Sequence, residues 1–420
     1  MHRAPFFLRF TLLSLLALLT LPARAGAPRF NDIDLPPHNY KERPLTDRFT
    51  QLKADLESGK LALDHASEKA ALLSLLHALE IPASSQMLVF STTSLQLSLI
   101  TPQNPRAIFF NEDISLGYIP GGKIEVVSLD PELGAIFYIF DIPRDPRPPR
   151  IERSERCMKC HATDATAGVP GILIKSVVPG PTGGSLNAFR IDQSGHQIPL
   201  TDRFGGWYLT GQPNFTNHWG NLIGRFTPQG LQKNPIIPGR VFSFARYAVA
   251  TSDILPQLVH EHQAGFANRV IEATYRARTH LHNSNGKLTA EQARELDDQA
   301  RILTRYLLFA DEAALPAGGI TGDPAFKADF LRQRRAAPDG TSLKDFDLRT
   351  RLFKHRCSYM IYSRIFQGLP AEMKSRVYER LRSALDPKQP DADFAYLPAA
   401  EKQTIKAILR ATLKELPASW

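Results

Sequence analysis

The chain has 420 residues, 43% of them hydrophobic and 22% charged, and a formal net charge of +9. This is the composition of an ordinary globular protein with enough apolar residues for a large core, and its basic balance favours anionic partners, including acidic proteins. No stripe of basic and aromatic residues indicates nucleic-acid binding, and three cysteines cannot all pair, so neither a nucleic-acid partner nor a complete disulfide framework is expected.

The N-terminus has the three-part layout of a secretory signal peptide. Arg3 and Arg9 precede and border an apolar run over residues 10–21, and Ala23-Arg24-Ala25 is a small-x-small cleavage pattern. An uncleaved N-terminal anchor is the alternative, although the run is shorter than the ~20 residues that span a bilayer comfortably. Removal of residues 1–25, which contain three arginines and no acidic residue, lowers the net charge to +6. The mature protein is therefore predicted to be periplasmic or otherwise exported, with no transmembrane segment.

Helices are expected first, over residues 45–80, and strands after them. TDRFTQLKADLESGK and SEKAALLSLLHALE place apolar residues at helical spacing, and each opens with a threonine or serine as N-cap. Short runs rich in branched and aromatic residues then predict a twisted antiparallel sheet: QMLVFSTTSLQLSLI, RAIFFN, ISLGYI, KIEVVSLD and GAIFYIFD. Two more strand-like runs, GILIKSVV and SLNAFRID, follow.

From about residue 252 the pattern is helical. SDILPQLVHEHQAGFANRVIEATYRART has Pro256 in its first turn, and TAEQARELDDQARILTRYLLFADEAA is strongly periodic. Shorter helices are expected at 324–333, 343–366, 371–385 and 399–414. The predicted fold class is α+β, with a helical segment over 26–84, a β-rich domain over 85–250 and an α-helical domain over 251–420 that is interpreted as packing scaffold.

The distinctive chemistry lies in ERCMKCHA, residues 155–162, where Cys157 and Cys160 flank two ordinary residues and His161 follows. A structural zinc site needs four ligands, usually in two paired sets, and no second pair is present. The third cysteine, Cys357, lies about 200 residues away among apolar residues and is interpreted as a buried thiol. A thioredoxin-like dithiol is expected in a βαβ unit, which the flanking sequence lacks.

Attachment of a c-type haem accounts for every part of this motif. The two thiols add across the two vinyl groups of the porphyrin, and the next residue presents its imidazole to the iron. This attachment is made outside the cytoplasmic membrane in bacteria, where the signal peptide sends the chain. One motif predicts one covalently attached haem c, bound by Cys157 and Cys160, with His161 as the proximal ligand of the iron.

The sixth ligand is less well defined by the sequence. His218 in TNHWGN is a candidate, although a loop histidine bonded to the backbone is the plainer interpretation. Met87, Met360 and Met373 lie in apolar patterns and are interpreted as packing residues. His262 could approach the haem from the helical region. The segment around it, LVHEHQAGF, does not match the H-E-x-x-H spacing of zinc proteases, and no catalytic residue is predicted.

Cationic and aromatic residues surround the motif in the sequence. The cations fit the haem propionates or a docking face for an acidic redox partner, and a solvated surface accounts for them equally well: Arg147, Arg150, Arg153, Arg156 and Lys159. The aromatic residues fit the lining of a haem pocket or ordinary core packing: Trp207, Tyr208 and Trp219.

Several segments, in this order, resemble exported bacterial mono-haem cytochrome c-like proteins: TPQNPRAIFFNEDISLGYIPGG, GAIFYIF, CMKCHAT with VPGILIKSV, GGWYLTGQ, NHWGN and RCSYMIYSRIFQGLP. The resemblance covers about residues 80–416. The β-rich part also resembles PAS-like periplasmic haem domains that carry a late Cys-x-x-Cys-His, which implies a PAS-like antiparallel β domain rather than the all-helical cytochrome c fold. The family has no settled reaction, so the resemblance implies the cofactor at Cys157, Cys160 and His161 and leaves the role open.

The first hypothesis is a periplasmic mono-haem cytochrome that transfers electrons to or from a redox partner protein by cycling between Fe(III) and Fe(II). The alternatives are a peroxidase-like haem enzyme with an open sixth position and a haem-based redox or gas sensor that acts through a separate partner. The chain shows no kinase or cyclase segment, so direct transmembrane signalling is not expected. Electron transfer is preferred to catalysis.

Overall fold

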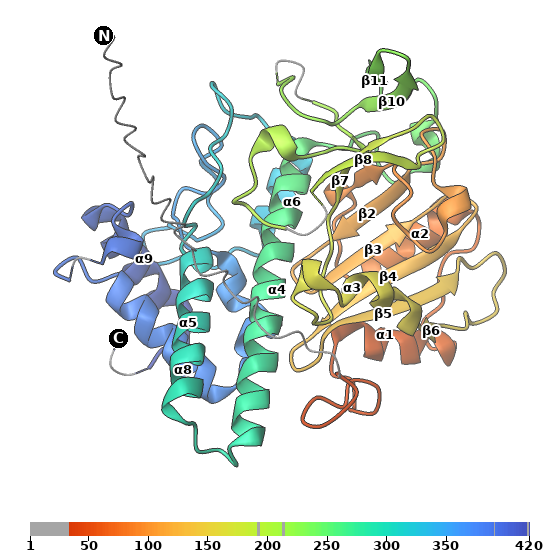
Figure 1. Ribbon diagram of the computed structural model, residues 1–420. Helices are drawn as coiled ribbons and strands as arrows, with labels where there is room; N and C mark the ends of the chain where they lie inside the picture. Colours follow the sequence, from red (N-terminus) through yellow and green to blue (C-terminus); the bar gives the residue numbers. More distant parts are fainter. Residues whose placement is uncertain (1–32, 191–193, 212–214, 390, 418–419) are drawn as a thin grey trace, which may run out of the picture.

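The computed structural model describes residues 33–190, 194–211, 215–389, 391–417 and 420. The predicted signal peptide, residues 1–25, lies outside these residues. The described chain forms a large antiparallel sheet with two short helices behind it and a long helix, α4, beside its other face (Figure 1). Within the described residues, no helix has both the length and the apolar character needed to cross a bilayer. The α+β class predicted from the sequence is confirmed in this general form.

The large sheet has seven strands in the order β6-β5-β4-β3-β2-β1-β9, and every neighbouring pair is antiparallel. Its strands are β1 (Met87–Val89), β2 (Arg106–Phe110), β3 (Ile114–Tyr118), β4 (Lys123–Asp130), β5 (Gly134–Asp141), β6 (Glu152–Arg153) and β9 (Trp207–Tyr208). The four strands expected over RAIFFN, ISLGYI, KIEVVSLD and GAIFYIFD are confirmed. The expected first strand is only three residues long, because Ser94 and neighbouring hydroxyls bond the local backbone instead of a ladder.

Alternation along the strands divides the core between the two faces of the sheet. On β5, Ala135 and Phe137 belong to the cluster that includes α4, whereas Ile136, Tyr138 and Phe140 belong to the cluster that includes the two short helices. This is the period of two expected for a sheet that is covered on both faces. We call the side that carries Phe137 the α4 face.

The two helices behind the sheet are α1 (Arg48–Glu57) and α2 (Glu68–Ala78). Ser67 caps α2 as expected, accepting a hydrogen bond from Ala70 N. The threonine cap expected for α1 is wrong: Asp47 is the N-cap, and Thr46 instead donates its hydroxyl to Asp130.

The helices after residue 250 are α4 (Ile254–Asn283), α5 (Ala290–Leu307), α6 (Pro324–Arg332), α7 (Arg364–Gln367), α8 (Ala371–Ala384) and α9 (Ala399–Thr412). The helix expected over 343–366 is wrong. Aspartate side chains hold this stretch in turns, since Asp347 accepts from Arg349 N and Thr350 N, and Leu348 has a φ of 59°. Only a 3-10 turn, Tyr359–Tyr362, precedes α7.

Two small hairpins complete the fold. One pairs β7 (Ser176–Pro179) with β8 (Ser185–Arg190), and the other pairs β10 (Leu222–Thr227) with β11 (Gly230–Pro235). The strand expected over GILIKSVV is confirmed only at its end, and the β10–β11 hairpin was not predicted.

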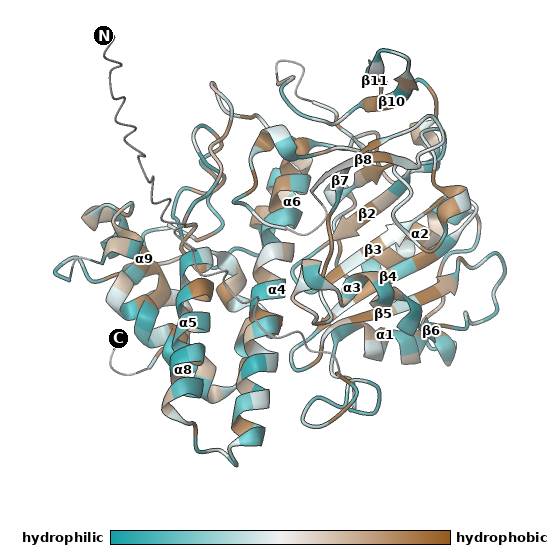
Figure 2. Ribbon diagram, viewed as in Figure 1, coloured by the Kyte–Doolittle hydropathy of each residue, from teal (hydrophilic) through white to brown (hydrophobic). Residues whose placement is uncertain are grey.

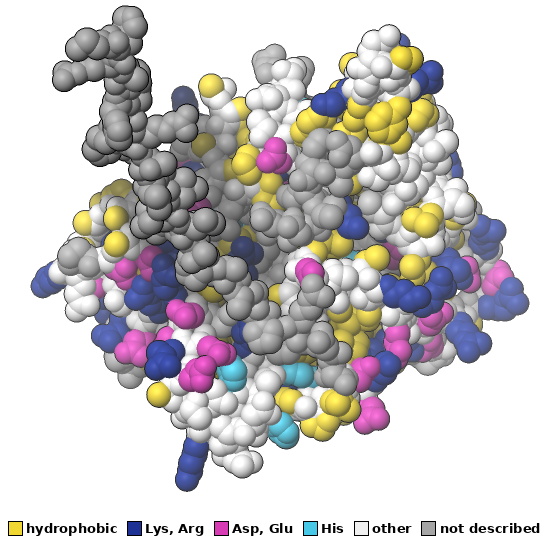
Figure 3. Space-filling view, viewed as in Figure 1, with side chains coloured by type: hydrophobic (Ala, Val, Ile, Leu, Met, Phe, Trp, Pro, Cys, Tyr) yellow, Lys and Arg dark blue, Asp and Glu magenta, His cyan; other side chains and the backbone are white. Residues whose placement is uncertain are grey.

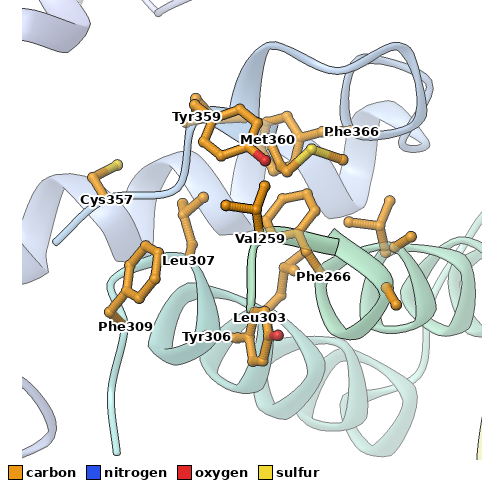
Figure 4. Packing of buried hydrophobic residues seen from close by; sticks show 14 of the residues in the cluster. Val259, Phe266, Leu303, Tyr306, Leu307, Phe309, Cys357, Tyr359, Met360 and Phe366 are labelled. Carbon is orange, nitrogen blue, oxygen red and sulfur yellow. The ribbon is translucent and has the colours of Figure 1, made fainter. Parts of the chain in front are cut away.

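The helical region and the sheet share one hydrophobic cluster rather than two separate cores. Residues of α4, α5 and the 357–366 segment pack together (Figure 4), and the same cluster includes Phe110 and Phe137 of the sheet. Polar residues line the outward sides of α5 and α8, whereas apolar residues run along β2 to β5 (Figure 2). The helices therefore act as one wall of the core that supports the α4 face.

Gly134 and Gly121 offer a test of this packing. Both have φ near +78° (78° and 79°), but a Cβ at Gly134 would lie 2.7 Å from the Pro170 carbonyl oxygen and 2.8 Å from Ile271, whereas one at Gly121 would meet nothing within 4 Å. We expect Gly134→Ala to lower the free energy of unfolding by about 3 kcal/mol, and Gly121→Ala by about 1 kcal/mol, the cost of the left-handed backbone alone. Urea unfolding checks this, and equal losses would contradict the close packing.

Candidate functional site

The Cys-x-x-Cys-His motif forms one turn of helix in front of the sheet (Figure 1). A 3-10 turn, Glu155–Cys157, continues into α3 (Met158–His161). Residues three and four apart lie on the same side of a helix, so Cys157, Cys160 and His161 share one side of this turn. Cys157 is partly buried and Cys160 is exposed, and both are free thiols. The turn thus presents two sulfurs and an imidazole together.

The ring of His161 is fixed by a hydrogen bond and an aromatic contact. Its Nδ1 lies 2.9 Å from the carbonyl oxygen of Gly171, and its ring centroid lies 4.7 Å from that of Phe137 on β5. A carbonyl can only accept, so Nδ1 carries the proton and Nε2 keeps its lone pair. Burial lowers the pKa of His161 to about 4, against the opposing effect of the Gly171 bond, so the imidazole is neutral at pH 7.

The partner of His161 is itself held by the long helix. Asn268 of α4 accepts from Ile172 N and donates to Ile172 O, both at 2.8 Å, directly after Gly171. Gly171 N also donates to the carbonyl oxygen of His161 at 2.8 Å. A Cβ at Gly171 would lie 2.6 Å from the Asn268 amide oxygen. The helical region therefore positions the imidazole through Asn268 and the Gly171–Ile172 backbone.

Beside the motif, the α4 face is apolar but incompletely covered. Ile108, Val127, Met158 and Ile174 are only partly buried although they pack against the main cluster. Gly117 faces Glu125 across the β3–β4 ladder and Ile108 across the β2–β3 ladder, and the Glu125 and Arg106 side chains lie over it. A flat apolar group would find contact area on the partly buried apolar residues beside this ion pair.

A haem joined to Cys157 and Cys160 fits these residues. An imidazole with Nδ1 bonded to a backbone carbonyl is the usual arrangement of a metal-ligating histidine, because the bond orients the ring and raises its basicity. The partly buried Ile108 and Val127 lie on the same face as Phe137, against which His161 packs. Cys157 and Cys160 would hold the porphyrin and His161 Nε2 the iron.

The two other interpretations of the motif are less well supported by the geometry. Burial raises the pKa of Cys157 above its usual value, whereas an active dithiol needs a cysteine with a lowered pKa. Across the described ranges, no group of three or more His, Cys, Asp or Glu side chains is arranged to hold a metal ion, as a zinc site would require.

No protein-family model, curated protein or solved structure matches this chain.

The candidate histidine ligands are engaged elsewhere in the structure. His218 packs between Phe204 and Phe215, and its Nδ1 accepts from Gly220 N at 3.0 Å. This is the backbone-bonded loop histidine of the plainer interpretation. His262 uses both ring nitrogens, with His196 Nδ1 at 2.8 Å and Ser358 Oγ at 2.7 Å, so the suggested approach of His262 to the haem is not supported.

The methionines and aromatic residues considered for the haem site lie in different parts of the fold. Met360 and Met373 are fully buried in the helical part, as packing residues would be, and Met87 is 2% exposed on β1. Trp207 belongs to the α4-face cluster and donates its indole N–H to Lys175 O, but Tyr208 is buried on the opposite face, where its hydroxyl donates to Pro102 O. Trp219 packs under the Lys233 ammonium.

The cations that bracket the motif are mostly at the surface. Arg147 pairs with Asp145, and Arg153 donates to the Tyr40 and Lys41 carbonyls. Arg150, Arg156 and Lys159 are exposed and make no ion pair within the part of the chain that the structure describes. Lys and Arg side chains lie on both the sheet side and the helical side of the molecule, interleaved with Asp and Glu (Figure 3). These exposed cations are free to meet an acidic surface.

Sequence reasoning missed Asn268, Gly171 and the Arg106–Glu125 ion pair described below. Arg106 and Glu125 stand in apolar strands at the positions that alternate toward the α4 face, and a charge at such a position is a signal that could have been used. Asn268 gave no such signal, because an asparagine within a helix is ordinary until its backbone partner is known.

Proposed function

We propose that this protein is an exported mono-haem c-type cytochrome that transfers electrons. The observation that carries the proposal is the hydrogen bond from His161 Nδ1 to the Gly171 carbonyl, which leaves Nε2 available in the residue that follows the two cysteines. We also propose that the sheet is a PAS-like haem domain, with α4 and the helices after it as scaffold. The predicted signal peptide supports export of the chain.

In this proposal the bound haem supplies one-electron chemistry by changing between Fe(III) and Fe(II). The chain does the rest. Cys157 and Cys160 fix the position of the group, and Gly171 fixes the orientation of the His161 ring. The apolar residues of the α4 face exclude water from one side, which tunes the potential. The exposed cations Arg150, Arg156 and Lys159 provide an attractive surface for an acidic redox partner.

The test is expression in a host that has haem-attachment machinery, with export through the chain's own N-terminus. We expect a pyridine haemochrome spectrum with two thioether bonds, one haem per chain, and reversible reduction and reoxidation without consumption of peroxide. Colourless protein with the mass of the bare processed chain would refute the haem proposal. Attached haem that binds carbon monoxide and consumes peroxide would instead support the peroxidase-like alternative.

A further inference from the structure

A buried ion pair lies on the α4 face, and the proposed function gives it no role. Arg106 of β2 and Glu125 of β4 are joined at 2.7 Å, and their side chains are only 15% and 20% exposed. Burying a charged pair is costly, and replacing such a pair by apolar side chains is often neutral or stabilising. The pair therefore calls for an explanation other than stability.

Glu125 is completely engaged, but Arg106 is not. The carboxylate of Glu125 accepts from Arg106, from the Ser94 hydroxyl and from the Gln96 amide. Burial alone would raise the pKa of Glu125, but these partners bring it below its usual value, so the group is an anion. The Nε of Arg106 is buried and finds no hydrogen-bond partner among the described residues. An unsatisfied guanidinium donor at this depth calls for an acceptor.

The pair lies close to the motif. Glu125 is paired with Ile139 of β5, two residues from Phe137 on the same face, and the Phe137 ring packs against His161. Both side chains also reach over Gly117, since a Cβ there would lie 3.4 Å from Glu125 Oε2 and 3.5 Å from Arg106 Cδ. The unused donor of Arg106 is thus on the face where a haem held by His161 would lie.

We propose that Arg106 binds a propionate of the haem and that Glu125 holds the guanidinium in place for it. This inference rests on the proposed function. A propionate is a carboxylate, and a guanidinium presents paired donors that match it. The cations near the cysteines in sequence are less suitable, because Arg147 and Arg153 have other partners and Arg150, Arg156 and Lys159 are exposed.

The experiment measures the haem content and the redox equilibrium of exported Arg106→Gln and Glu125→Gln proteins. Both should keep one covalent haem, because the thioether bonds do not involve these residues. At a fixed applied potential, Arg106→Gln should lower the Fe(II)/Fe(III) ratio about tenfold, equal to about 59 mV, since a positive charge near the iron stabilises Fe(II). Glu125→Gln should shift the ratio in the opposite direction.

A second readout identifies the propionate. A carboxylate that loses its guanidinium partner has a raised pKa, so the potential of Arg106→Gln should vary with pH over roughly pH 5 to 7 while the unmodified protein stays flat. Arg106→Lys, which keeps the charge, should restore most of the ratio. Arg376→Gln is the matched control: its side chain is 21% exposed and ion-paired on α8, and its loss should change neither quantity.

Whether haem is attached distinguishes a failure of the proposed function from a failure of the role of Arg106. Failure of the unmodified protein to attach haem refutes the proposed function itself. Attached haem with an unchanged potential in both Arg106→Gln and Glu125→Gln refutes the role of Arg106. An Arg106→Gln protein whose potential shifts without any pH dependence, but whose cyanide affinity falls, would show that Arg106 faces the iron and not a propionate. If Arg106→Gln does not fold, Arg106→Lys and Glu125→Gln decide by the same measurements.

Discussion

Replacing both Cys157 and Cys160 by alanine is expected to give an exported chain without covalent haem. The two thioether bonds are the only covalent links in the proposal, and alanine costs little packing because Cys160 is exposed and Cys157 is only partly buried. Intact mass should equal that of the bare processed chain, and the denatured protein should show no haemochrome absorption. Each single alanine variant should keep one thioether bond, which shifts the haemochrome band measurably from that of the unmodified protein.

Cys357→Ala is the matched control, because it removes the third thiol without touching the motif. Cys357 is fully buried in the helical core (Figure 4), and removing its sulfur should cost about 1 to 2 kcal/mol of unfolding free energy. Its haem content should remain one per chain. Haem retained in the double variant, or lost in Cys357→Ala, would contradict attachment at Cys157 and Cys160.

Elements of this fold were predictable from sequence where the physical signal is local. Strands β2 to β5 and helices α4, α5, α8 and α9 were predictable because their apolar residues repeat at the period of the element. The helix expected over 343–366 failed where Asp345 and Asp347 bond the backbone and compete with helix formation. The same competition shortened β1, where serine and threonine residues follow the strand.

The site was predictable only where its residues are adjacent in sequence. Cys157, Cys160 and His161 form one turn, so their spacing carries the chemistry. The residues that orient and tune them come from elsewhere: Asn268 lies 107 positions after His161 in the chain. Such pairings depend on how α4 crosses the sheet, which no local pattern encodes. The scaffold interpretation of the helical region becomes specific here, because α4 holds the backbone that orients the imidazole.

Buried histidines are expected to make the free energy of unfolding fall as the pH drops below about 6.5, which is above the pH at which exposed carboxylates titrate. Burial lowers the pKa of His260 and His262 to about 3 and that of His196 well below 6.5. These residues stay neutral in the folded protein, but in the unfolded chain they bind protons below about pH 6.5. The unfolded state therefore gains protons on acidification, and stability falls as pH falls through this window.

Glu312 acts in the opposite direction. Burial raises the pKa of Glu312 to about 7, so the folded protein binds this proton as the pH falls through about 7. In the unfolded chain the carboxyl has its ordinary pKa of 4.5 and binds the proton only near that pH. Between pH 6.5 and 5 the three histidines should together cost about 5 kcal/mol, and Glu312 should return roughly 1.5 to 2 kcal/mol. The net expected loss of unfolding free energy from these four groups is about 3 kcal/mol, and His38 and His161, whose pKa values burial lowers to about 4, act in the same direction. The loss is measured as urea midpoints by far-UV circular dichroism.

Two variants show how much of this pH dependence of the unfolding free energy comes from Glu312 and how much from the histidines. Glu312→Gln should increase the loss between pH 6.5 and 5 by roughly 1.5 to 2 kcal/mol, because the opposing proton is gone. His262→Gln should decrease it by about 1.5 kcal/mol, although it also weakens the protein at pH 7 by leaving His196 and Ser358 without their partner. His65→Gln, at an exposed position, should leave the slope unchanged. A stability that is level from pH 6.5 to 5 in every variant would show that the three histidines are not held neutral in the fold.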